Sequence, residues 1–128
     1  MTRKGAAESA PQDAQALRGV LPMLLLSQVA RQESYGYELV VRLQRLGLTD
    51  LATGTVYPAL TRLESEGALS SRLVASAAGP ARKYYSLTEH GTRVLAASAT
   101  RWKTLGAIVD SALAPLPPAT QPQTQEDQ

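Results

Sequence analysis

Apolar residues recur at helical spacing early in the chain and predict a first helix. They form a single stripe made of Leu17, Leu21, Leu24, Leu25 and Val29. Proline is tolerated mainly in the first turn of a helix, because it lacks a backbone N–H and clashes with the preceding turn. Pro22 therefore predicts that the helix proper begins near Val20, with residues 15–19 as a lead-in.

A second helix is predicted over residues 35–46. Ser34 has a side chain that is favoured at a helix N-cap, and Gly47 is a residue type that often follows the last turn. Tyr37 is interpreted as a mainly structural core aromatic, since the chain contains no phenylalanine. The apolar positions expected to be buried are Leu39, Leu43 and Leu46.

A third helix is predicted from Thr53, another N-cap candidate, to Gly67. Its apolar stripe consists of Val56, Leu60 and Leu63. The rest of its surface carries small and polar residues, namely Gly54, Thr55, Pro58, Thr61, Arg62 and Ser65. Pro58 is expected in an early turn, for the same reason as Pro22.

Two strands and a long helix follow. Residues 69–74 alternate loosely between apolar and polar and residues 83–87 alternate well, with a flexible hairpin tip at 76–81. Thr88 is expected to cap the last helix. The apolar positions of that helix are Val94, Leu95, Trp102, Leu105, Ile108, Val109 and Leu113.

This order of elements is the plan of the winged helix-turn-helix fold. The predicted fold class is mainly α with a small β-hairpin, a winged helix-turn-helix followed by a C-terminal dimerisation helix. The predicted divisions are a flexible arm (1–14), a DNA-binding domain (15–87), the dimerisation helix (88–114) and a disordered Pro/Gln-rich tail (115–128). Pairing with a second copy is expected because the last helix would otherwise expose a large apolar patch.

Composition excludes several kinds of chemistry. The chain of 128 residues has no cysteine and one histidine, His90, interpreted as a surface residue. Disulfides, thiolate zinc sites, cysteine nucleophiles and paired-histidine sites are therefore excluded, and we expect neither cofactor nor metal nor enzymatic activity. The longest apolar run, residues 20–26, is too short to span a membrane and begins too late for a signal peptide. A cytoplasmic protein without membrane contact is expected.

The charge is concentrated in the middle of the chain. Residues 15–114 hold eleven Lys or Arg side chains against seven Asp or Glu, a net charge of +4. A basic domain suits a polyanionic partner. The small, polar side of the third helix suits a DNA major groove, and the adjacent cations Arg82 and Lys83 at the hairpin suit phosphate.

Several spaced motifs, in the same order, resemble those of the PadR family of transcriptional regulators. They are Gly36–Leu39, Thr53–Leu60, Arg62–Glu64 with Gly67, and Arg82–Glu89 with Gly91. The resemblance covers residues 17–113 and is similar to the smaller subgroup, which has one C-terminal helix. It implies a homodimeric repressor whose third helix and wing bind DNA and whose last helix dimerises. Two-fold symmetry then implies a pseudo-palindromic operator.

The candidate residues follow from this resemblance. For DNA binding they are Tyr35, Thr53, Gly54, Thr55, Tyr57, Pro58, Thr61, Arg62, Gly79, Arg82 and Lys83. For dimerisation they are the seven apolar positions of the last helix. Trp102, the one tryptophan, has two interpretations: an anchor of the dimer interface, or a stacking platform for a small aromatic effector.

Two other function classes compete with this prediction. A winged-helix module that binds protein instead of DNA would keep the fold, but it would not need Arg82 and Lys83 on the hairpin. A small enzyme would need clustered catalytic groups or a phosphate-binding glycine loop, and the sequence has neither.

Overall fold

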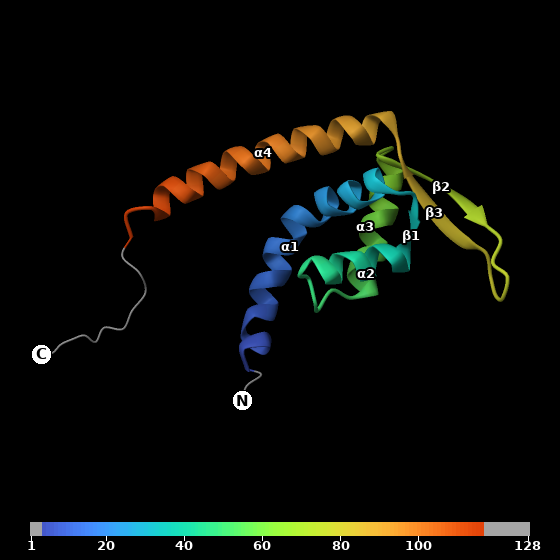
Figure 1. Cartoon of the computed structure of the whole chain (residues 1–128), viewed down its shortest axis with the longest axis horizontal. Coiled ribbons are helices and arrows are strands. Elements are labelled where there is room, and N and C mark those ends of the chain that lie inside the picture. Colours follow the sequence, from blue (N-terminus) through green and yellow to red (C-terminus); the bar gives the residue numbers. More distant parts are fainter. Residues whose placement is uncertain (1–3, 117–128) are drawn as a thin grey trace, which may run out of the picture. The chain divides into compact units, whose positions relative to one another are not determined.

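Four helices and a small antiparallel sheet make up residues 4–116, the part of the chain that the computed structural model describes, with side chains from residue 15 onward. The elements are α1 (Lys4–Arg31), β1 (Ser34–Tyr35), α2 (Gly36–Leu46), α3 (Thr53–Ser65), β2 (Leu69–Val74), β3 (Arg82–Leu87) and α4 (Glu89–Leu113), shown in Figure 1. The predicted fold class, a mainly α winged helix-turn-helix with a small hairpin, is confirmed. Most of the predicted tail, residues 117–128, lies outside the described residues.

The chain divides into two compact units, Met1–Ser98 and Ala99–Gln128. The first unit contains α1, α2, α3, the sheet and the beginning of α4. The second contains the rest of α4. Within residues 4–116 no helix combines the length and the apolar character needed to cross a membrane.

The core of the first unit is built mainly from leucine and valine. The buried apolar side chains are Leu21, Leu25, Leu26, Val29, Leu39, Val40, Leu43, Leu51, Val56, Leu60, Leu63, Ala68, Leu69 and Tyr85. The predicted stripe of α3 is thus confirmed in full. The prediction for Leu46 is wrong, since its side chain is 65% exposed. Leu46 ends α2, and Leu48 and Leu51 in the following turn pack against the core instead.

The start of α1 differs from the prediction. The helix begins at Lys4, so a start near Val20 is wrong, and residues 4–14 of the expected arm are helical. Pro22 lies inside the helix, where proline costs about 3 kcal/mol. Leu21 and Leu25 are buried on either side of it, and each buried leucine contributes about 1.5–3 kcal/mol. Burial on both sides of Pro22 therefore offsets its cost.

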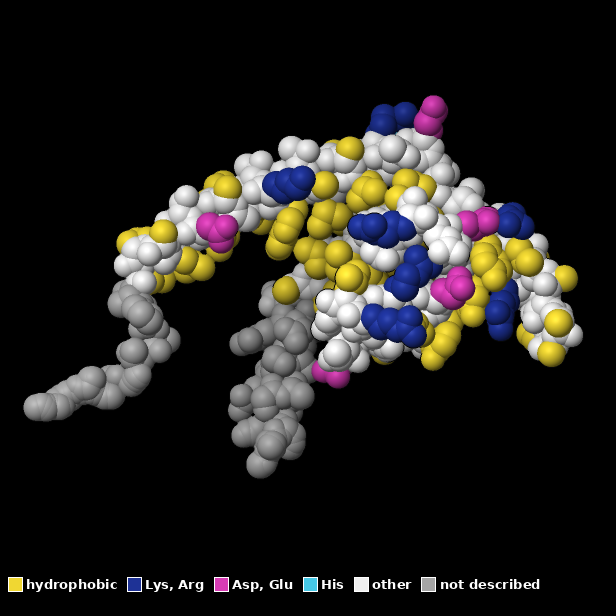
Figure 2. Space-filling view, viewed as in Figure 1, with side chains coloured by type: hydrophobic (Ala, Val, Ile, Leu, Met, Phe, Trp, Pro, Cys, Tyr) yellow, Lys and Arg dark blue, Asp and Glu magenta, His cyan; other side chains and the backbone are white. Residues whose placement is uncertain are grey.

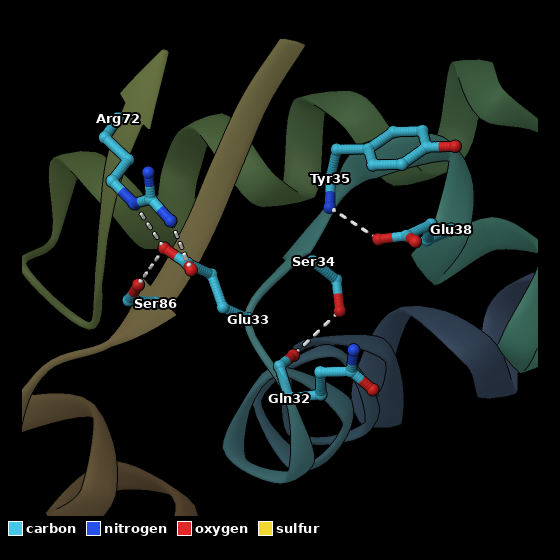
Figure 3. Close-up of polar contacts among 7 residues, drawn as sticks. All are labelled: Gln32, Glu33, Ser34, Tyr35, Glu38, Arg72 and Ser86. Carbon is cyan, nitrogen blue, oxygen red and sulfur yellow. Dashed lines mark hydrogen bonds and ion pairs between the residues drawn. The ribbon is translucent and has the colours of Figure 1, made fainter. Parts of the chain in front are cut away.

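Two predicted N-caps are also wrong, and one is confirmed. Tyr35 is the N-cap of α2, and its backbone N–H donates to Glu38 Oε1 at 3.1 Å (Figure 3). Ser34 instead belongs to β1, where its hydroxyl donates to the Gln32 carbonyl at 2.7 Å. Thr53 is the first residue of α3, after the N-cap Ala52. Thr88 does cap α4, because its Oγ1 accepts a hydrogen bond from the Gly91 N–H at 2.9 Å.

The sheet has the strand order β1-β3-β2, and both pairings are antiparallel. The sequence does not predict β1, because two residues are too few to show alternation. We call β2, β3 and residues 75–81 between them the wing. Its inner face carries the buried Tyr85 together with Ser71 and Lys83, and its outer face carries Arg72, Arg82, Tyr84 and Ser86. Tyr35 of β1 pairs with Tyr84 and joins the outer face.

The beginning of α4 packs tightly against the rest of the first unit. Gly91 is buried, and a Cβ at this position would lie 2.0 Å from the Ala68 carbonyl oxygen. Thr88 Oγ1 also donates to the Gly67 carbonyl at 2.6 Å. Val94 and Leu95, further along, are partly buried against the core of the same unit. These contacts require a residue without a side chain at position 91.

Candidate nucleic-acid interface

The sequence-predicted residues of α3 lie on one exposed surface. While Val56, Leu60 and Leu63 point into the core, the other side of the helix is exposed at Thr53, Gly54, Thr55, Tyr57, Pro58, Thr61 and Arg62. Apart from the Tyr57 ring, the side chains on the first turns of this surface are short. The backbone of α3 can therefore approach another molecule closely, with hydroxyls and one guanidinium available to donate hydrogen bonds.

Pro58 lies inside α3 and not in its first turn. Since proline has no N–H, the carbonyl of Gly54, four residues earlier, loses its usual backbone donor. Both residues are exposed, so water or a ligand can hydrogen-bond to that carbonyl. Pro58 thus supplies no donor to a backbone carbonyl that lies on the exposed surface.

Two exposed tyrosines, Tyr57 in α3 and Tyr37 in α2, differ in their surroundings. Tyr57 packs its ring against Gly36, where an added Cβ would lie 2.6 Å from Tyr57 Cε1. Gly36 is therefore required for the position of this ring. Tyr37 is 56% exposed, so its prediction as a core aromatic is wrong. It precedes Leu39 by two residues, which places it roughly 200° around α2 from the buried side.

On the outer face of the wing, Arg82 lies over an aromatic cluster. Its Cζ is 4.4 Å from the centroid of the Tyr35 ring, within the range of a cation–π interaction. The Tyr35 and Tyr84 rings meet edge to face, with centroids 5.3 Å apart. Tyr35, a predicted DNA-binding residue, therefore supports Arg82 from the short strand β1. Gly79, also predicted, is exposed in the tip of the wing with a φ of 130°.

Lys83 lies on the inner face of the wing and is paired with α3. Its Nζ is 3.0 Å from Glu64 Oε1, and the Ser71 hydroxyl donates to Glu64 Oε2 at 2.5 Å. The hydrogen bond from Ser71, followed by that from Lys83, lowers the pKa of the Glu64 carboxyl below its usual value. The two sequence-predicted wing cations, although adjacent in the chain, thus point to opposite faces and have different partners.

Glu33 forms a polar cluster that the sequence pattern does not predict (Figure 3). It lies in the link between α1 and β1 and accepts hydrogen bonds from Arg72 Nε at 2.8 Å and Arg72 Nη2 at 2.7 Å. Ser86 Oγ donates to the same carboxylate at 3.0 Å. The bonds from Arg72 and Ser86 lower the pKa of Glu33. One carboxylate therefore holds both strands of the wing, but its partners are too distant in sequence to form a motif.

The described surface is moderately basic, because acidic side chains lie among the Lys and Arg side chains. On the face in Figure 2, some Lys and Arg side chains lie close together near the centre and others lie singly toward the edges, with Asp and Glu side chains among them. A shallow hollow of about 420 Å³ lies on the wing, lined by Val74, Ala75, Ser76, Ala77, Ala78, Arg82 and Tyr84. Within the described residues there is no group of three or more His, Cys, Asp or Glu side chains that could hold a metal ion.

Comparison with known proteins identifies the family. The profile of the "Transcriptional regulator PadR-like family" matches residues 25–97. The crystal structure of a PadR-like transcriptional regulator from Bacillus cereus is 36% identical, with a TM-score of 0.70, and the match covers 77% of this chain and 96% of that one. A PadR family regulator from Eggerthella lenta is also 36% identical, with a TM-score of 0.74 and coverages of 84% and 94%.

A further solved structure, a transcriptional regulator from Streptococcus, is 35% identical over 77% of this chain and 96% of that one, with a TM-score of 0.70. The search of curated proteins gives no match. The matched profile includes α2, α3 and the wing, whose geometry is described above. The chain belongs to the PadR-like family of DNA-binding transcriptional regulators.

Proposed function

We propose that this chain is a homodimeric repressor that binds a pseudo-palindromic operator, with α3 in the major groove and the wing along the phosphate backbone. The observation that carries the proposal is the exposed surface of α3. An α-helix fits the major groove of B-DNA, and short hydroxyl side chains allow the close approach that base contacts require. Thr61 and Arg62 are the residues of this surface to which we assign contacts with base edges.

The residues around α3 have supporting roles in this proposal. Thr53, Gly54 and Thr55 form the first turn of the helix. The Thr55 N–H donates to the Ala52 carbonyl at 3.1 Å, so the N–H groups of Thr53 and Gly54, together with the helix dipole, are the ones that favour a phosphate. Tyr57, Pro58 and the wing residues lie beside the DNA backbone. Phosphate contacts of this kind position a protein on the duplex and make its affinity depend on salt.

Dimerisation is supported by α4 in the second unit. Its exposed large apolar side chains follow one another at spacings of three, three, one and four residues: Trp102, Leu105, Ile108, Val109 and Leu113. Figure 2 shows hydrophobic side chains gathered along this helix. Such an apolar stripe is stabilised when a second copy covers it. The two α3 helices of a dimer would then read half-sites about 34–36 Å apart.

Trp102 supports a second, regulatory part of the proposal. Its indole is 52% exposed in the single chain, on the same stripe. In a dimer it can act as an anchor of the interface or offer a stacking surface to a flat aromatic effector. An effector would change DNA affinity only by binding one arrangement of the dimer better than the other. We assign Trp102 the anchor role first and the effector role second.

The test begins with selection of duplexes from a random-sequence library by the purified full chain. We expect enrichment of a pseudo-palindrome, and absence of any enriched sequence would contradict the proposal. The variant Arg62→Ala should then weaken binding to the selected duplex by about 1–3 kcal/mol, and weaken binding to mixed-sequence DNA much less. Ser65→Ala, at the far end of α3, is the matched control and should bind like the wild type.

A further inference from the structure

The wing contains three cations and no acidic residue of its own. They are Arg72 on β2 and Arg82 and Lys83 on β3. Two of the three are paired with carboxylates that come from outside the wing. The charge that the wing offers to a polyanion is therefore smaller than its sequence suggests.

Glu64 neutralises the cation on the inner face. Its carboxylate contacts Lys83 on β3 at 3.0 Å and Ser71 on β2 at 2.5 Å, so it holds both strands against the end of α3. Lys83 also lies 5.7 Å from the centroid of the Tyr85 ring, which directs it toward the core side of the wing. This arrangement connects the wing to the helix proposed to enter the major groove.

Glu33 neutralises a second cation on the outer face. Its two carboxylate oxygens accept hydrogen bonds from Arg72 Nε and Nη2 in a bidentate pair. The Ser86 hydroxyl donates to Oε2 of the same carboxylate (Figure 3). Bidentate pairs of arginine and carboxylate are more directional than pairs of single contacts. Each face of the wing is thus held by one carboxylate that contacts both strands.

Arg82 differs from the other two cations. Within the described residues it forms no ion pair with a carboxylate, and it rests on the Tyr35 ring, which meets Tyr84 edge to face. It also borders the hollow of about 420 Å³ on the wing, where it is the one charged residue of the lining. A fixed, uncompensated guanidinium beside a hollow is suited to a phosphate group.

We propose that Arg82 alone is the wing's phosphate contact, and that Lys83 and Arg72 are positioning residues that hold the wing through Glu64 and Glu33. The inference rests on the proposed DNA binding and assigns different roles to two adjacent cations. A pair with no net charge releases few counterions from DNA, whereas an uncompensated cation that meets a phosphate releases about one.

The experiment measures the affinity of the full chain for a fixed mixed-sequence duplex over a range of salt concentrations. The slope of log K against log salt is negative, and Arg82→Gln should make it less steep by roughly 0.9 for each chain bound. Arg93→Gln is the matched control, because it removes one exposed arginine from α4 and should leave the slope unchanged. The double variant Glu64→Gln with Lys83→Gln removes the pair without altering net charge, and it should keep the wild-type slope.

A third comparison shows whether Glu64 withholds Lys83 from DNA. Glu64→Gln alone should free Lys83. The affinity for mixed-sequence DNA should then rise, and its dependence on salt should become steeper. Glu66→Gln removes the same charge two residues away and should change the affinity and the salt dependence much less. Melting curves followed by circular dichroism would verify that each variant is folded.

Two results would overturn the inference. One is a double variant whose salt dependence becomes less steep by as much as that of Arg82→Gln, which would make Lys83 a phosphate contact. The other is an Arg82→Gln protein that matches Arg93→Gln. A wild-type protein that binds no duplex at any salt concentration would instead overturn the proposed function, and the inference with it.

Discussion

The two units of this chain differ in how far their apolar side chains are buried. In the first unit, leucines and valines from α1, α2, α3 and the sheet are buried against each other. In the second, the large apolar residues of α4 remain about half exposed. Both conditions occur along α4, since Val94 and Leu95 are partly buried against the core of the first unit, whereas Leu105 and Val109 of the second unit are 51% and 44% exposed. The first unit therefore has an apolar core of its own, whereas the apolar stripe of α4 is the surface for which we propose a second copy as the partner.

The largest effect is expected from a cavity in the first unit. Leu60 is fully buried, so Leu60→Ala should lower the free energy of unfolding by about 2–5 kcal/mol. Leu73, on the wing, is 72% exposed, and Leu73→Ala is the matched control with a change within about 0.5 kcal/mol. Denaturant unfolding measures both. Equal losses would contradict the view that the buried leucines of this unit determine its stability.

A charge on the exposed stripe of α4 should affect association and leave the fold intact. Leu105→Asp would place an unpaired carboxylate in the proposed interface and raise the dimer dissociation constant at least roughly a hundredfold, about 3 kcal/mol. Sedimentation should show monomers, with the helical circular dichroism of the first unit retained. Ala107→Asp, two residues on and roughly 200° around the helix, should remain dimeric. A dimeric Leu105→Asp protein would place the interface elsewhere.

Trp102 allows a more selective change to the same stripe. If the indole serves an effector, planar aromatic compounds should quench its fluorescence saturably and alter DNA affinity in parallel. Trp102→Ala should then abolish the effect of those compounds on DNA binding while sedimentation still shows a dimer. If Trp102→Ala dissociates the dimer, the anchor role is correct. If no compound in a panel quenches saturably, the effector role is wrong.

The apolar pattern predicts most of the first unit. The stripe of α3, the long hairpin and the Thr88 cap are correct because each depends on residues close in the sequence. The α1 start is wrong because Pro22 is a local signal, while burial of Leu21 and Leu25 is set by the whole core. Leu46 is exposed because it ends α2, and periodicity alone does not show where a core ends. The Tyr37 prediction is wrong for a different reason, since it relied on composition and not on the helical position of this residue away from the buried side.

For the candidate interface, the sequence predicts which residues are available but not how they are paired. The residues assigned to α3 are exposed as a set, which follows from their position opposite Val56 and Leu60. The different environments of Arg82 and Lys83 depend on strand alternation and on Glu64 and Tyr35, which come from other elements. The pair of Glu33 with Arg72 joins residues 39 positions apart and leaves no local pattern.

The smallest effect concerns the carboxylates that hold the wing, since exposed ion pairs contribute little to stability. Glu33 faces Arg72 from β2 and Ser86 from β3, while Glu64 faces Ser71 and Lys83 from the same two strands. In the folded chain the pKa of both glutamates is lowered, first by the hydrogen bonds from Arg72 and from Ser71. Their contribution is therefore present above the unfolded value of about 4.3 and is lost as pH falls through the lower folded values.

Acidification should accordingly loosen the wing before it affects the buried leucines, which do not titrate. We expect the melting temperature of the wild type to fall between about pH 5 and pH 3 by more than that of a Glu33→Gln, Glu64→Gln double variant. All other acidic residues are shared by the two proteins, so their titration cancels in the difference. Amide hydrogen exchange should locate the acid-induced change in β2 and β3, with the amides of α3 still protected. If the two proteins respond identically to acid, the wing is held by its backbone pairing and not by these carboxylates.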